Sequence, residues 1–140
     1  MAPQSNLLLD THALIWTVEG RSLQPGAERA INLASAAGEP IYVSPISAWE
    51  RGMLVAKGRI TSRIPPKLWF EQVVSQPQIA LAGLSPAILT DASFLPAPLH
   101  GDPADRIIIA TARAYDLTLV THDRAILDYA RSGHVRALAC

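Results

Sequence analysis

The sequence predicts an α/β fold in which helices cover both faces of a mostly parallel sheet. Three observations support this prediction. Short apolar runs without alternation, at residues 6–9, 41–43 and 117–120, are typical of strands buried on both faces. Segments with helical spacing lie between these runs, which is the order expected for a parallel sheet. The 140 residues, 49% hydrophobic and 17% charged, fit one domain, residues 1–140, with a sizeable core.

Turn and capping residues mark where each predicted element begins and ends. An apolar turn over 13–16 follows the first strand, and Pro25 and Gly38 bound a helix over 25–37. The strand over 41–43 leads into a helix from Ser44 to about Lys57, which Gly58 closes. The remaining predicted elements are helices at 65–76, 85–94, 102–115 and 123–131, strands at 79–82, 117–120 and 135–138, and a loop at 96–101.

The composition excludes several classes of protein. The 12 Lys and Arg residues balance the 12 Asp and Glu residues, so the zero net charge disfavours binding to nucleic acid by bulk positive charge. Cys140 is the only cysteine, which excludes an intrachain disulfide and a thiolate zinc site. No apolar run is long enough for a signal peptide or a membrane span. We therefore expect a soluble cytoplasmic protein without membrane association.

Aspartates occur at the ends of the predicted strands. Asp10 comes directly after the first strand, Asp123 lies just beyond strand 117–120, and Asp102 and Asp105 begin the helix before that strand. Sites in parallel sheets form outside the carboxyl ends of the strands, so these carboxylates are expected to converge. A structural interpretation stands beside this one. Asp10, Asp102 and Asp123 occupy N-cap positions, and an acid in a first helical turn, such as Asp105, favours the helix dipole.

Glu50 lies within the helix after strand 41–43, beside an apolar stripe that includes Ile46 and Trp49. A carboxylate at this position needs either a metal ion or a partner arginine, with Arg51 and Arg106 as the candidates. Several carboxylates in one pocket raise one another's pKa unless a cation neutralises them. Oxygen ligands without thiolates favour Mg²⁺ or Mn²⁺. The set therefore suggests metal-assisted hydrolysis of a phosphodiester.

Four segments together resemble the PIN-domain ribonucleases, specifically the VapC-type toxins of toxin–antitoxin pairs. They are residues 7–16 (LLLDTHALIW), residues 44–60 beginning SPISAWE, residues 102–112 (DPADRIIIATA) and residues 119–123 (LVTHD). The resemblance spans almost the whole chain in the family's order and implies a three-layer α/β/α sandwich. Arg51 and Gly52 depart from the family's pattern, which more often has apolar or helix-favouring residues after the glutamate.

The resemblance also implies a site, a cofactor and partners. The implied catalytic and metal-binding residues are Asp10, Glu50, Asp105 and Asp123, with Thr121, Asp102 and Arg106 as possible support. Mg²⁺, with Mn²⁺ as a plausible substitute, would activate the water that hydrolyses RNA phosphodiester bonds. The implied partners are the RNA substrate, a small VapB-type antitoxin and a second copy of the chain in a homodimer.

Basic residues are concentrated between positions 51 and 70, where no acidic residue occurs. Arg51, Lys57, Arg59, Arg63 and Lys67 give this interval a charge of +5. They form an RNA-binding rim, a solvated helix face or a docking surface for an antitoxin. Arg51, Lys57 and Arg59 are therefore candidate substrate-binding residues, together with His12, which lies beside Asp10.

Two other functions fit part of this pattern. A PIN-like nuclease that processes RNA or cuts structured nucleic acid without an antitoxin would have a similar sequence. A receiver-like signalling domain also gathers acids around Mg²⁺, but it needs an acidic pair after the first strand and a late lysine. Here Asp10 stands alone and no lysine follows Lys67. We therefore expect a Mg²⁺-dependent endoribonuclease that acts as a toxin.

Overall fold

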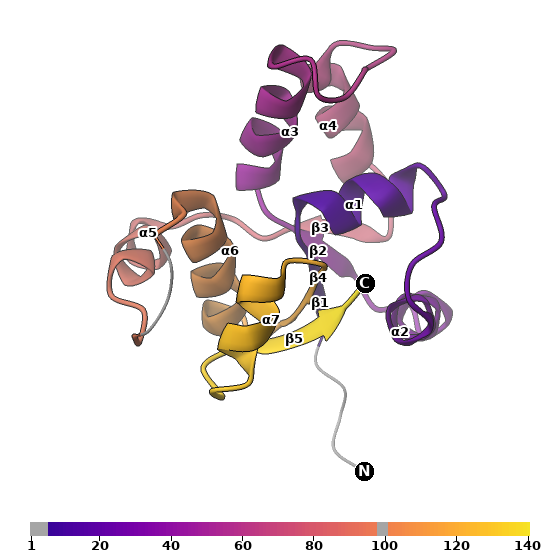
Figure 1. Cartoon of the computed structure of the whole chain (residues 1–140). Helices are drawn as coiled ribbons and strands as arrows, with labels where there is room; N and C mark the ends of the chain where they lie inside the picture. The colour runs from indigo at the N-terminus through magenta and orange to yellow at the C-terminus, as the bar shows by residue number, and fades with distance from the viewer. Residues whose placement is uncertain (1–5, 98–100) are drawn as a thin grey trace.

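The computed structural model describes residues 6–97 and 101–140 (Figure 1). Within these residues the centre is a five-stranded sheet of order β3-β2-β1-β4-β5, and every strand pair is parallel. The strands are β1 (Leu7–Leu9), β2 (Ile41–Val43), β3 (Ile79–Leu81), β4 (Thr118–Thr121) and β5 (Arg136–Ala139). The prediction of an α/β fold with a mostly parallel sheet is therefore confirmed.

Helices fill the connections between the strands. They are α1 (Thr11–Val18), α2 (Pro25–Ala36), α3 (Ile46–Ala56), α4 (Pro66–Val74), α5 (Pro86–Ser93), α6 (Pro103–Ala114) and α7 (Arg124–Ala130). The sequence predicted only a brief apolar turn after β1. Instead the chain forms the eight-residue helix α1, because the Asp10 carboxylate caps it through the backbone N–H of Ala13. The predicted loop at 96–101 lies partly outside the described residues.

The strand side chains alternate between two core layers, which explains why the runs are apolar throughout. Leu8 is fully buried in one cluster with Ile108 of α6 and Ile126 of α7. Leu7 and Leu9 are buried in a second cluster, on the other face, with residues of α1, α2 and α4. Figure 1 shows α5, α6 and α7 on one side of the sheet and α1 and α2 on the other. The three-layer α/β/α sandwich is thus confirmed.

The central strand β1 determines where a site can form. Strands β2 and β3 extend the sheet on one side of β1, and β4 and β5 extend it on the other. The segments that follow β1 and β4 pack on opposite faces, and binding sites in such sheets lie beyond the strand ends at this point. The backbone N–H of Asp10 donates to the carbonyl of Val120 at 3.0 Å, which holds the two strand ends together. None of the described helices is long and apolar enough to cross a membrane.

Candidate active site

Asp10 occupies the centre of the site, between β1 and α1. The residue is only 6% exposed, and both carboxylate oxygens accept hydrogen bonds. Oδ1 accepts from the N–H of Ala13 at 2.8 Å, and Oδ2 accepts from the hydroxyl of Thr121. The buried Thr121 hydroxyl also accepts from the backbone N–H of Asp123 at 3.0 Å. Thr121 therefore links the acids that follow β1 and β4.

Glu50 reaches the same region from α3, and its partner is a hydroxyl group. The hydroxyl of Thr11 donates to Oε1 of Glu50 at 2.5 Å, and it lies 2.9 Å from the hydroxyl of Ser47. Thr11 and Ser47 are both buried, so the glutamate is oriented by the start of α1 and the first turn of α3. Of the arginine partners considered from the sequence, Arg51 donates to Ser62, and Arg106 donates to the carbonyls of Ala92 and Ser93.

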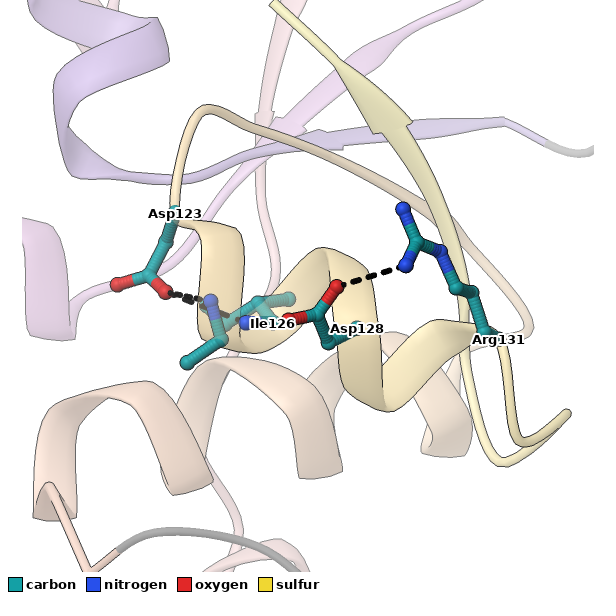
Figure 2. A network of polar contacts seen from close by, with 5 residues as sticks. Asp123, Ile126, Asp128 and Arg131 are labelled. Atoms are coloured by element: carbon teal, nitrogen blue, oxygen red, sulfur yellow. Dashed lines mark hydrogen bonds and ion pairs between the residues drawn. The ribbon is translucent and has the colours of Figure 1, made fainter.

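Two other aspartates, Asp102 and Asp123, each cap a helix with one carboxylate oxygen. Oδ1 of Asp102 accepts from the backbone N–H of Asp105 at the start of α6. Oδ1 of Asp123 accepts from the N–H groups of Ala125 and Ile126 at 2.8 and 3.2 Å. Figure 2 shows the second oxygen of Asp123 pointing away from α7. The capping interpretation of these residues is correct, and it leaves Oδ2 of Asp123 outside the capping bonds.

Mutual repulsion among the acids appears in their proton affinities. Burial raises the pKa of Asp10 and of Glu50, and the hydrogen bonds from Thr121 and Thr11 oppose this rise. The largest effect is on Asp105, where burial and then repulsion raise the pKa to about 7. The repelling carboxylates are, in decreasing order, Asp102, Asp123, Glu50 and Asp10. The structure therefore brings the other four acids within electrostatic reach of Asp105.

The donor set fits a hard divalent cation. It consists of carboxylate oxygens, which Mg²⁺ and Mn²⁺ prefer, and a cation would relieve the repulsion that raises the pKa of Asp105. As placed, no three Asp, Glu, His or Cys side chains among residues 6–97 and 101–140 form a group that could hold a metal ion. Mg²⁺ usually keeps several waters and takes one or two carboxylates, so it needs no closed cage of protein ligands.

A groove leads from the acids toward the basic end of α3. It has a volume of about 280 Å³ and is lined by Glu50 and Asp102 on the acidic side and by Lys57 and Arg59 on the basic side. His12 also lines it, together with Trp49, which is 59% exposed. The apolar stripe expected to bury Trp49 is therefore wrong at this residue. The structure does bring Lys57, Arg59 and His12 to the acidic site.

Two other candidate residues lie away from the groove. Arg51 is only 6% exposed, and its guanidinium carbon lies 3.8 Å from the ring centre of Trp69 in α4. Its Nη2 donates to Ser62, whereas Nε and Nη1 are buried without a hydrogen-bond partner among the described residues. Arg106 donates to the carbonyls of Ala92 and Ser93, at the end of α5. The expected exposure of Arg51 to substrate is corrected, because it packs between α3 and α4.

Sequence reasoning missed the two hydroxyl residues that orient Glu50. Ser47 precedes Glu50 by three positions, so both lie on one face of α3. Thr11 directly follows Asp10 and is only 4% exposed. The available signal was a hydroxyl residue beside a strand-end acid, a pattern that Thr11 after Asp10 shares with Thr121, which the family resemblance had implied.

Known proteins resemble this chain in sequence and in fold. Residues 7–132 match the family described as PIN domain. Ribonuclease VapC22 of Mycobacterium tuberculosis is 35% identical over 123 residues, which cover 87% of this chain and 90% of that protein. A chain of VapBC2 from Rickettsia felis, solved bound to a DNA fragment from their promoter, has a TM-score of 0.65 at 16% identity and covers 95% of this chain and 97% of its own. A chain of FitAcB from Neisseria gonorrhoeae has a TM-score of 0.55 at 24% identity, with coverages of 94% and 96%. The two solved structures share the fold.

Proposed function

This chain belongs to the PIN domain family, and we propose that it is a metal-dependent endoribonuclease, the toxin of a toxin–antitoxin pair. The observation that supports this most is the meeting of Asp10, Glu50, Asp105 and Asp123 beyond the strand ends, where burial first and then repulsion from the other acids raise the pKa of Asp105 to about 7. Isolated caps or core carboxylates would not raise one another's pKa in this way. The similarity to Ribonuclease VapC22 supports RNA as the substrate.

Asp10, Glu50, Asp105 and Asp123 would hold the cation, with Mg²⁺ as the expected ion and Mn²⁺ as a substitute. When bound, the cation supplies a water of lowered pKa and positive charge beside the phosphate. Asp102 adds negative charge to the rim of the groove. The bound cation would therefore favour the phosphodiester at the point where the carboxylates alone repel it.

The chain's own hydroxyl groups fix the geometry of the acids. Thr121 holds Oδ2 of Asp10 and the backbone of Asp123, so it sets the distance between the acids at the two strand ends. Thr11 holds Oε1 of Glu50, and its hydrogen bond lowers the pKa of that carboxyl against the effect of burial. Both contacts favour the ionised acids that a cation needs.

Lys57 and Arg59 line the groove next to the acids and would contact the phosphates of a single-stranded or looped RNA. The resemblance of the sequence to VapC-type toxins supports an antitoxin partner, and so does the likeness of the fold to chains of VapBC2 and FitAcB. The proposed partner is thus a small VapB-type protein, and a homodimer is the proposed assembly of the single domain. The cytoplasm, where both the RNA and such an antitoxin occur, is the proposed location.

The experiment that tests this function is cleavage of a mixed RNA pool by the purified chain. We expect cleavage with Mg²⁺ and none with EDTA or in Asp10→Asn, which keeps the cap on α1 but removes an anionic oxygen. Asp128→Asn is the matched control, since Asp128 pairs with Arg131 on the exposed side of α7 (Figure 2). Cleavage that persists both in EDTA and in Asp10→Asn would show that the nuclease activity does not use this site.

A further inference from the structure

Three aromatic rings and a guanidinium form a connected cluster beside the acids. The ring centres of His12 and His122 lie 4.9 Å apart in an edge-to-face contact. The ring of Trp16 lies 4.7 Å from that of His122 and 5.9 Å from that of His12. The guanidinium carbon of Arg21 lies 4.9 Å from the centre of the Trp16 ring. These contacts join α1 to the loop between β4 and α7.

The cluster lies at the active site because of where its histidines stand in the chain. His12 follows Asp10 by two residues, and His122 directly precedes Asp123. His12 also lines the groove that contains Glu50. The same strand ends therefore place both the acids and the rings.

The histidines are exposed although the rings contact one another. The partly buried Trp16 packs against the core cluster that α1 covers, and its ring contacts both histidine rings. Trp16 and His12 are four residues apart, so they share one face of α1. The core does not account for the exposed histidine rings, because they contribute little buried apolar surface to it. A surface of rings that is held in place yet open to solvent suits a planar ligand.

We propose that His12, His122 and Trp16 form a nucleobase-stacking subsite that holds the base next to the phosphate being cut. This inference rests on the proposed ribonuclease function and adds the place where a base of the RNA binds. Lys57 and Arg59 line the groove and would contact phosphates, whereas the carboxylates repel them, so a contact with the base itself would add to the positioning of the RNA beside the acids. Aromatic rings provide such contacts, since every base has a face that stacks on them. Each stacked base commonly raises affinity by about tenfold or more.

The test uses a single-stranded RNA that the protein cuts at one position, and a series in which each nucleotide in turn lacks its base. For the wild-type protein we expect removal of one base beside the cut to lower kcat/KM by about tenfold. The double variant His12→Ala/His122→Ala should cut the intact RNA about tenfold more slowly, and removal of the same base should have no further effect. When His122→Phe takes the place of His122→Ala in this double variant, the sensitivity to base removal should return, because phenylalanine keeps a stacking face.

His134→Ala is the matched control. The His134 ring also packs on an aromatic ring, that of Tyr129 at 5.4 Å, but outside the acidic site. We expect its rate and its response to base removal to match those of the wild type. Thermal unfolding of every variant checks that the fold is kept.

A binding measurement separates the failure of this inference from failure of the proposed function. The fluorescence anisotropy of the same RNAs is measured in EDTA with Asp105→Asn, with and without the two histidine substitutions. This measurement reports binding and does not depend on cleavage. If RNA is cut and the histidine variants keep the wild-type response to base removal, the subsite does not exist but the ribonuclease function stands. If no RNA is cut, the proposed function fails, and the subsite survives only if base removal weakens binding in a way that depends on the histidines. Loss of antitoxin binding with unchanged RNA kinetics would assign the rings to the partner protein and overturn the proposal.

Discussion

Asp105 is the acid of the site whose ionisation the fold opposes most strongly. Its pKa is raised from 3.8 to about 7 by burial and by four neighbouring carboxylates. One pKa unit corresponds to about 1.4 kcal/mol, so the full difference would correspond to about 4 kcal/mol. Asp105 is only partly buried, and water screens its charge, so we take about half of this value, ~2 kcal/mol.

The perturbation that removes this energy is Asp105→Asn. It leaves intact the capping bond from the backbone N–H at this position to Oδ1 of Asp102. It does remove a favourable contact between a charge and the start of α6, which is worth about 0.5 kcal/mol. The cost of burying this charge among the other carboxylates is larger, so we expect a net gain in the free energy of unfolding of about 1.5 kcal/mol for the metal-free protein at about pH 8. For a domain of this size the gain corresponds to a rise in Tm of about 5 °C.

The dependence on pH follows from the direction of the shift. The folded protein holds the Asp105 proton more tightly than the unfolded chain does, so ionisation of this group destabilises the fold. The destabilisation is absent below about pH 4, grows as the pH rises toward 7, and is complete above that value. The advantage of Asp105→Asn should therefore disappear near pH 4.

The assay is urea unfolding in EDTA at about pH 8 and about pH 4, repeated with Mg²⁺. Mg²⁺ should stabilise the wild type more than Asp105→Asn, because it binds only the folded state and needs the carboxylate. Asp128→Asn, which breaks an exposed pair with Arg131, should give no gain at either pH. The reasoning is refuted if Asp105→Asn is no more stable than the wild type at about pH 8 without metal, or if its gain is equal at both pH values.

Three further predictions concern α3 and its contacts. Gly52→Ala should raise the free energy of unfolding by about 1 kcal/mol, because a Cβ at this position meets nothing within 4 Å. Gly58→Ala should lower the free energy of unfolding, because the φ of Gly58 is +70°. Urea unfolding of both variants checks this, and a less stable Gly52→Ala would contradict it. Thr11→Val removes a hydrogen bond that lowers the pKa of Glu50, so the acid side of the rate profile should move to higher pH, and an unchanged profile would argue against this role. Arg51→Met should leave KM for RNA unchanged and the free energy of unfolding within about 1 kcal/mol of the wild type, because two guanidinium nitrogens have no hydrogen-bond partner among the described residues. A large rise in KM in cleavage kinetics would show that Arg51 does belong to the substrate site.

Local residue chemistry was sufficient to predict most of the fold. The apolar runs of β1, β2 and β4 admit no solvent-facing side, and the sheet that contains them is parallel and covered on both faces. The caps at Asp10, Asp102 and Asp123 were equally visible, because the preference for aspartate at these positions is local. Only the helix after β1 was missed. An apolar segment of about one turn gives no periodicity by which a helix and a turn can be told apart.

The errors at the site concern residues whose environment depends on distant segments. Trp49 lies on an apolar stripe, but the described residues leave its side chain 59% exposed, and periodicity carries no information about neighbours. Arg51 was counted as a surface charge, yet Trp69 from α4 lies against its guanidinium. The contact of Thr11 with Glu50 joins residues 39 positions apart in the chain. Such pairs form only through the packing of α1 against α3.

The two interpretations of the strand-end aspartates proved compatible, and the geometry explains why. A helix N-terminus carries a partial positive charge, and α1, α6 and α7 all begin at this edge of the sheet with an aspartate cap. These three helix starts partly offset the repulsion among carboxylates that would otherwise oppose folding without a metal. Asp105 lies one turn into α6 instead of at a cap, and its pKa is raised to about 7. The zero net charge of the chain is thus a sum over an uneven distribution. The helix N-termini lower the energetic cost of gathering the acids in one pocket, and the negative charge that remains is left for a cation to neutralise.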